Sequence, residues 1–367
     1  MEEAEQLVKV LQSGWLSNGP KTRELEESIA DHLGVTKEQV IVNINCTAAL
    51  HASLLALGVG KGDEVLVADF TFPATAHAVM HAGATPRFID IDLDTFNMDP
   101  SKVEEKINKK TKAIIPVHAF GQPAEMDELM EIADKHGLFL IEDAACAFGA
   151  TYKGRPAGTI GDMGCFSFHA IKGITSGEGG AIVAKDRHVA DKARKLCNYG
   201  IESAWDRHSK VNIPTFTCLG YNYKISDLQS AVALAQLRKI DKLLERRSKL
   251  AKLWSQELAP LVAIGLVSEQ RSPEGTVRCH QSQVVLLDRS IDRNIVLATL
   301  AEKYAVEATL GTYCCHIQPV YDSKDVCPNA KLAAEQSISL PLFFELDEEK
   351  VHYCAESLTA SIETSKR

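Results

Sequence analysis

The chain has 367 residues, of which 45% are hydrophobic and 24% are charged. This length is enough for a large core and for two domains. The net charge of −9 leaves no broad basic surface, so the composition argues against a nucleic-acid-binding protein.

The N-terminal residues Met1–Glu5 are acidic and lack the basic and apolar regions of a signal peptide, and no apolar run reaches membrane-spanning length. The ten cysteines are scattered along the chain, which favours free thiols over disulfides. We therefore expect a cytoplasmic protein that does not bind membranes. The first motif follows Met1 closely, which is consistent with a missing N-terminal segment.

From about residue 40 to residue 185, short β-branched runs alternate with amphipathic segments. The pattern predicts a strand at 41–44, a helix at 47–57, a strand at 64–68, a helix at 74–82, strands at 87–91 and 113–117, a helix at 125–136 and a strand at 138–142. Such alternation is typical of an α/β fold with a mostly parallel sheet flanked by helices. Runs at 164–169 and 180–184 are joined by too little chain for a helical crossover, so we expect antiparallel or irregular neighbours.

After Asp227 one long helical pattern continues to about Leu258, and we interpret it as a spine joining two domains. A strand at 281–287, a helix at 295–304 and a closing helix near 348–361 then predict a smaller α+β domain. We expect residues 1–240 to form a large domain and residues 241–367 to form a small C-terminal domain.

Lys172 is the most informative residue, because an apolar segment typical of a buried strand leads it into a glycine-rich loop. Burial would lower the pKa of this lysine and supply the free amine that a Schiff base needs. A solvated surface lysine is the alternative. Asp143 ends another apolar strand, at the same rim of the predicted sheet. Pyridoxal phosphate (PLP) needs such a pair, since a lysine holds its aldehyde and a carboxylate keeps its pyridine nitrogen protonated.

Three further residues are candidates for the same site. Thr47 follows a strand and opens a helix, where its hydroxyl and the amides of residues 46–48 would bind a phosphate; an ordinary helix cap is the alternative. Phe72 follows the next strand and offers a flat ring for stacking, although most phenylalanines belong to a core. Ser167, on the strand before Lys172, is a candidate phosphate donor.

Two other kinds of chemistry have little support. No Cys-x-x-Cys pair occurs, and the neighbouring side chains of Cys314-Cys315-His316 would diverge on a strand, so we predict no metal site. The segment Asn45–Ala49 lacks the glycine fingerprint of a nicotinamide-dependent oxidoreductase.

The ordered motifs resemble the DegT/DnrJ/EryC1/StrS family of PLP-dependent sugar aminotransferases, within the fold-type I aspartate aminotransferase superfamily. The similarity runs nearly end to end and rests on the segments 13–21, 45–51, 62–65, 70–76, 116–123, 141–145, 166–172, 177–180, 220–223 and 339–342. The resemblance implies a fold-type I PLP transferase in which Lys172 forms the Schiff base, Asp143 contacts the pyridine nitrogen and Phe72 stacks on the ring. Cys146 stands where the family has glutamine or histidine beside the cofactor hydroxyl, and a thiol is a weaker donor.

On the phosphate side, the resemblance implies that Thr47, Ala48 and Ser167 hold the cofactor phosphate. Asn222 would reach the phosphate of the neighbouring subunit, which implies a homodimer with shared active sites. Cys46 departs from the glycine that the family has there, and so puts a side chain where the backbone approaches the phosphate.

The implied reaction moves an amino group from L-glutamate to a keto sugar, most commonly a nucleotide-linked one, in the biosynthesis of a cell-surface polysaccharide or natural product. A keto sugar acid or a cyclitol is the alternative acceptor. Family members that dehydrate keto sugars have histidine in place of the lysine, so Lys172 favours the transaminase. A non-enzymatic regulatory homologue is a further alternative, and the intact Lys172 and Asp143 argue against it.

Overall fold

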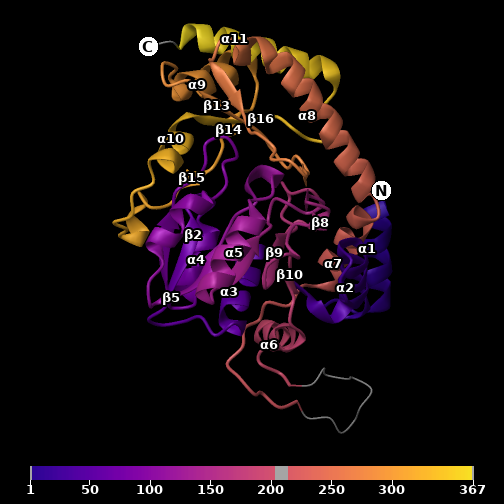
Figure 1. Ribbon diagram of the computed structural model, residues 1–367. Helices are drawn as coiled ribbons and strands as arrows, with labels where there is room; N and C mark the ends of the chain where they lie inside the picture. The colour runs from indigo at the N-terminus through magenta and orange to yellow at the C-terminus, as the bar shows by residue number, and fades with distance from the viewer. Residues whose placement is uncertain (1, 203–213, 366–367) are drawn as a thin grey trace.

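The centre of the protein is a seven-stranded sheet with helices on both faces (Figure 1). The computed structural model describes residues 2–202 and 214–365. The strand order is β1-β10-β9-β6-β5-β2-β4. In chain order these strands are β1 (Val40–Asn43), β2 (Glu64–Ala68), β4 (Thr85–Ile89), β5 (Thr111–Ile115), β6 (Phe139–Asp143), β9 (Met163–Ser167) and β10 (Gly180–Ala184).

Most neighbouring strands of this sheet are parallel. Strand β2 pairs in parallel with β4 and β5, and β6 pairs in parallel with β5 and β9. Strand β10 is antiparallel to both β9 and β1, because residues 168–179 leave no room for a helical crossover. The predicted α/β fold with a mostly parallel mixed sheet is confirmed.

Helices bury both faces of the sheet, so its strands are apolar on both sides. They are α2 (Pro20–Leu33), α3 (Cys46–Ala56), α4 (Ala74–His81), α5 (Met126–His136), α6 (Arg187–Cys197) and α7 (Asp227–Leu237), while α1 (Glu2–Ser13) packs on α7. In β2, Val65 packs in the core beneath α3, α4 and α6, whereas Leu66 packs in the core beneath α5. Helix α3 is apolar all round because it is enclosed by the sheet, α4 and α6.

The prediction of one continuous helix from Asp227 to about Leu258 is wrong. Helix α7 ends at Leu237, and a second helix, α8, runs from Ile240 to Ala263. The helical spacing of apolar residues persists across the two residues between them, so the sequence pattern hides the break. In Figure 1, α8 passes from the large sheet to the second lobe.

The second lobe has its own antiparallel sheet and core. The sheet has the order β11-β13-β16-β14, with β11 (Val267–Glu269), β13 (Gln283–Leu287), β14 (Thr309–Leu310) and β16 (Ser337–Leu340). Helices α9 (Arg293–Tyr304) and α11 (Glu348–Thr364) pack with α8 around the fully buried Trp254. A smaller α+β lobe is therefore present, and the exact division into residues 1–240 and 241–367 stays a prediction.

Short elements connect the two lobes. Strand β15 (Tyr313–Cys314) pairs with β3 (Phe70–Thr71), so chain from the C-terminal lobe lies beside the end of β2. The remaining elements are α10 (Pro328–Gln336), β7 (Thr151–Tyr152), β8 (Arg155–Pro156), β12 (Thr276–Val277) and the 3₁₀ helices Lys37–Gln39, Pro100–Lys102, Glu104–Lys106, Ala119–Gly121 and Pro319–Tyr321.

Within the described residues, no helix combines the length and the hydrophobicity that a membrane span requires.

Candidate active site

Lys172 lies in the loop between β9 and β10, at the rim where the parallel strands end. The loop is closed at its base, where the amide of Phe168 donates to the carbonyl of Gly179 at 2.8 Å. Lys172 is half-buried, and its Nζ donates to Sγ of Cys146 at 3.1 Å. The loop therefore holds the amine over the strand ends and away from open solvent.

The ionisation of Lys172 differs from the sequence-based expectation. Burial disfavours the ammonium, as predicted, but Cys146 and Asp143 favour it, and the pKa of Lys172 is raised. The expected lowering is wrong for the protein without a bound cofactor, because the sequence does not reveal that a thiol lies against the amine.

Asp143 ends β6 and is 5% exposed. Its Oδ2 accepts a hydrogen bond from the Thr75 hydroxyl at 2.7 Å, and its Oδ1 accepts one from the Ala145 amide at 3.1 Å. Burial raises the pKa of Asp143 and outweighs these two hydrogen bonds and the charge of Lys172, which lower it. The sequence interpretation missed Thr75, although it lies in the same motif as Phe72.

A buried pair behind Asp143 fixes the end of β6. Nε2 of His118 lies 2.9 Å from Oε2 of Glu142, and both side chains are inaccessible to solvent. Because the Ala124 amide donates to Nδ1 of His118, the proton of this imidazole is on Nε2 and points at Glu142. The other bonds to Glu142 come from the amides of Gly158, Ile160 and Gly161, at 2.6–2.7 Å. The sequence interpretation also missed this support.

The candidate phosphate site is the N-terminus of α3. Asn45 caps the helix, because its Oδ1 accepts the amide hydrogen of Ala48 at 2.8 Å. The Ala48 amide predicted to bind phosphate is thus already bonded, while Thr47 is half-buried at the first turn. Cys46 is 8% exposed, packs in the core and lies close enough to Asp143 and Lys172 for their charges to act on its thiol. A phosphate would therefore meet Thr47 before Ala48.

Strand register brings Ser167 toward the same helix end. Ser167 lies opposite Gly180 of β10, and Gly180 lies opposite Asn43 of β1. A side chain at Gly180 would collide with the backbone of Asn45 and Cys46, at 2.6 and 2.8 Å from its Cβ. The glycine thus lets the α3 N-terminus approach the strand pair that carries Ser167.

Phe72 and Asn222 are both exposed. Phe72 is 64% exposed, which is unlike a core phenylalanine, and its ring centroid lies 6.0 Å from that of Tyr313. Asn222 accepts a hydrogen bond from Nζ of Lys224 at 2.5 Å. The described hydrogen bonds do not join Asn222 to Lys172 or to Asp143.

These residues fit PLP. The carboxylate of Asp143 is buried and forms no ion pair among the described residues, so a protonated pyridine nitrogen would complete its contacts. Lys172 supplies an amine close enough to Asp143 to be influenced by its charge. A helix N-terminus and an exposed aromatic ring at the same rim supply an anion site and a stacking surface.

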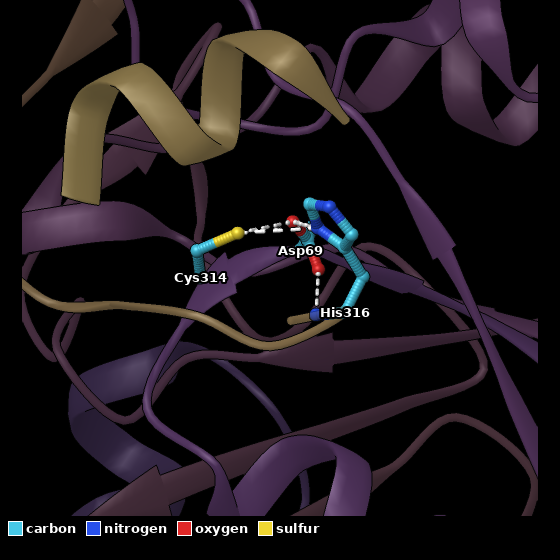
Figure 2. Close-up of side chains that lie close together, drawn as sticks. All are labelled: Asp69, Cys314 and His316. Atoms are coloured by element: carbon cyan, nitrogen blue, oxygen red, sulfur yellow. Dashed lines mark hydrogen bonds and ion pairs between the residues drawn. The ribbon is translucent and has the colours of Figure 1, made fainter. Parts of the chain in front are cut away.

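A second cluster lies outside this site, beside the end of β2 (Figure 2). Asp69, Cys314 and His316 place their side-chain ligand atoms within 4.8 Å of one another. The prediction that the side chains of Cys314-Cys315-His316 diverge is correct for Cys314 and Cys315, but it overlooked that the strand ends at Cys314 and that the following turn brings His316 to the same carboxylate.

Comparison with known proteins places this architecture in one class, the PLP-dependent aminotransferases. Among solved structures, the aminotransferase TlmJ from Streptoalloteichus hindustanus superimposes with a TM-score of 0.92 at 31% identity, over 99% of this chain and 96% of that one. Spr1654 from Streptococcus pneumoniae, solved in PLP and PMP forms, is 28% identical with a TM-score of 0.91; the alignment of its PLP form covers 99% of this chain and 96% of that one.

The sequence comparisons define the family more closely. A model of the DegT/DnrJ/EryC1/StrS aminotransferase family matches residues 1–359. The spore coat polysaccharide biosynthesis protein SpsC of Bacillus subtilis is 37% identical over 97% of this chain and 93% of its own length. The chain belongs to the DegT/DnrJ/EryC1/StrS aminotransferase family, as the motifs predicted, and is a sugar aminotransferase by family.

Proposed function

We propose that this protein is a PLP-dependent aminotransferase that moves an amino group from L-glutamate to a nucleotide-linked keto sugar. The observation that carries the proposal is the convergence of the Lys172 amine and the buried Asp143 carboxylate at one rim of the sheet. The name of SpsC supports a product destined for a polysaccharide. The free thiols of the described residues support a cytoplasmic enzyme.

Each site residue has a proposed task. Asp143, held by Thr75, keeps a proton on the pyridine nitrogen of PLP. Phe72 covers one face of the ring, and Thr47 and Ser167 bind the phosphate, with Ala48 as a weaker contact because its amide is already used by Asn45. When bound, PLP supplies an electron sink that stabilises negative charge at the carbon that loses its proton.

Lys172 has two tasks in this proposal. It holds the cofactor between turnovers, and once the amino donor has displaced it, its free Nζ moves the proton between the substrate carbon and the cofactor carbon. Cys146, at 3.1 Å from Nζ, orients the released amine. Asn222 of a neighbouring chain completes the phosphate site in a homodimer.

The donor and the acceptor are tested together by a coupled assay for 2-oxoglutarate. Purified protein is incubated with L-glutamate and a panel of nucleotide-linked keto sugars, keto sugar acids and cyclitols. We expect 2-oxoglutarate to appear with a nucleotide-linked keto sugar and not with the same sugar lacking the nucleotide. Turnover with only a keto sugar acid or a cyclitol would replace the proposed acceptor.

The cofactor is tested separately from turnover. The protein should show the visible absorption of a PLP imine, and borohydride should bleach it and fix PLP on Lys172. Lys172→Ala should still bind PLP but fix none of it. A protein that cannot be loaded with PLP would refute the proposal whatever the acceptor panel shows.

A further inference from the structure

The cluster of Asp69, Cys314 and His316 is unusually tight for side chains from distant parts of the chain. Sγ of Cys314 lies 3.1 Å from Oδ2 of Asp69 and 3.1 Å from Nδ1 of His316, and Nδ1 lies 2.6 Å from the same Oδ2. Figure 2 shows the three side chains pointing toward one another. A sulfur, a nitrogen and an oxygen therefore meet around one point.

Strand pairing explains this convergence. Cys314 lies opposite Phe70 in the pair formed by β15 and β3, next to Asp69. Strand β15 ends at Cys314, and the turn that follows brings His316 back to Asp69, where its amide and its Nδ1 both contact the carboxylate. Cys315 turns the other way, and its Sγ donates to the carbonyl of Thr71 at 3.7 Å.

The surroundings hold the cluster in place. Asp69 and Cys314 are 0% and 1% exposed, and the side chain of His316 is 12% exposed. The His316 amide donates to Oδ1 of Asp69 at 2.6 Å, which fixes the carboxylate and leaves Oδ2 directed at the sulfur and the imidazole.

A plain ion pair between Asp69 and His316 is the simpler interpretation of the shortest contact. In that interpretation the Cys314 thiol donates a second hydrogen bond to the same Oδ2, which leaves Sγ and Nδ1 only 3.1 Å apart with both of their protons directed at one oxygen. A single cation satisfies all three atoms at once. Tetrahedral zinc, with bonds of about 2.0–2.3 Å, places such ligand atoms roughly 3.3–3.6 Å apart. To reach this spacing, the two contacts of Sγ would have to lengthen by roughly 0.4 Å and the contact between Nδ1 and Oδ2 by about 0.7 Å.

We propose that Asp69, Cys314 and His316 form a binding site for a divalent cation of borderline softness, in the first place zinc. Binding replaces the thiol proton of Cys314 and the Nδ1 proton of His316, which both go to solvent, and leaves the neutral imidazole with its proton on Nε2. Three protein ligands leave one coordination position for water. The cation would join the C-terminal lobe to the end of β2, close in the chain to β3 and to Phe72, so we assign it a structural role.

Zinc binding to the PLP-loaded protein tests this site. Equilibrium dialysis with metal analysis should give one zinc per chain, and X-ray absorption should show one zinc–sulfur distance of about 2.3 Å. Cys314→Ala should remove this sulfur and weaken zinc binding by more than about a hundredfold, since changes outside the ligand shell alone cost 10- to 100-fold. Cobalt should give tetrahedral d–d absorption at wavelengths longer than those of PLP.

Cys315→Ala is the matched control, because it removes the adjacent thiol, which points away from the cluster. It should keep the zinc and its sulfur signal. Cys314→Ser, which keeps size and hydrogen bonding, should lose the zinc–sulfur signal even if Cys314→Ala folds poorly. The proposal is overturned if the unmodified protein binds no more zinc than Cys314→Ser, and the cluster is then an ion pair only.

Discussion

Thr75 controls the charge of Asp143. Its hydroxyl donates to Oδ2 at 2.7 Å. This hydrogen bond favours the charged carboxylate and lowers the pKa of Asp143, whereas burial raises the pKa and has the larger effect. Thr75→Val keeps the shape but removes this bond, so the pKa of Asp143 should rise further. A hydrogen bond to a charged group contributes roughly 1.5–3 kcal/mol. We therefore expect PLP affinity, measured by titrating the PLP-free protein, to fall about 10- to 100-fold.

Thr75→Ser is the control for this prediction, because it keeps the hydroxyl and loses only a methyl group. Its PLP affinity should stay close to that of the unmodified protein. Equal affinities for the valine and serine variants would show that the hydrogen bond to Asp143 does not matter for the cofactor.

Cys146 sets the pH at which Lys172 becomes a free amine. Burial lowers the pKa of Lys172, but Cys146 and Asp143 outweigh burial and raise it. The ammonium is therefore favoured up to a higher pH than in an ordinary lysine, and only the free amine attacks the aldehyde of PLP. Cys146→Ala should lower the pKa of Lys172, so the midpoint of the pH profile for covalent PLP capture should move to lower pH. Rapid-mixing absorbance on the PLP-free protein measures it.

The matched control is Cys279→Ala. The thiol of Cys279 donates to the backbone carbonyl of Cys146 at 3.1 Å and has no bond to the lysine amine. Its removal should leave the midpoint of PLP capture in place. A midpoint that stays unchanged in Cys146→Ala would contradict the role of this thiol.

Between secondary-structure elements, the N-terminus of α2 is capped by a residue that is distant in sequence. Asp227, the first residue of α7, accepts the amide hydrogens of Gly19 at 2.6 Å and Thr22 at 3.3 Å, and the Thr22 hydroxyl at 2.7 Å. A side chain at Gly19 would put its Cβ 2.6 Å from the carboxylate. Asp227 is 1% exposed, so one buried carboxylate joins the two helices.

Asp227→Ala should detach α2 from α7. It leaves backbone amides unsatisfied in a buried place, and we expect a loss of about 2–4 kcal/mol in the free energy of unfolding. Denaturant unfolding measures this loss, and limited proteolysis should cut the region of α2 sooner. Asp31→Ala, on an exposed position of α2, should change neither; equal effects of both substitutions would argue against the cap.

The sequence predicted those parts of the structure whose signals are local. The alternation of strands and helices, the short connection between β9 and β10 and the loop of Lys172 each depend on residues within a few positions of one another. The contacts that it missed join residues far apart: Thr75 and Asp143 are separated by 68 positions, Thr22 and Asp227 by 205, and Asp69 and His316 by 247. Such partners meet only once the order of the strands is fixed, and no local pattern encodes that order.

For the whole molecule, the proposed phosphate site needs a residue from a second chain. The exposed Asn222 is bonded to Lys224, and the described hydrogen bonds do not connect it to Ser167 on the phosphate side. In the proposed homodimer, two-fold symmetry gives each site Lys172 from one chain and Asn222 from the other. Asn222→Ala should then weaken retention of PLP in the partner's site, while Lys172→Ala should prevent covalent fixation in its own.

Mixing these two variants distinguishes a shared site from a site within one chain. When weakly held PLP is dialysed away before borohydride is added, neither variant alone should fix PLP. A mixed dimer has one site with both defects and one site with neither. Because random pairing makes about half of the dimers mixed, about a quarter of all sites are intact, and the mixture should fix about a quarter of the PLP of the unmodified protein. Mass spectrometry should find it only on the Asn222→Ala chain. If Asn222 acts within its own chain, no mixed dimer contains an intact site, and the mixture should fix no more PLP than the separate variants.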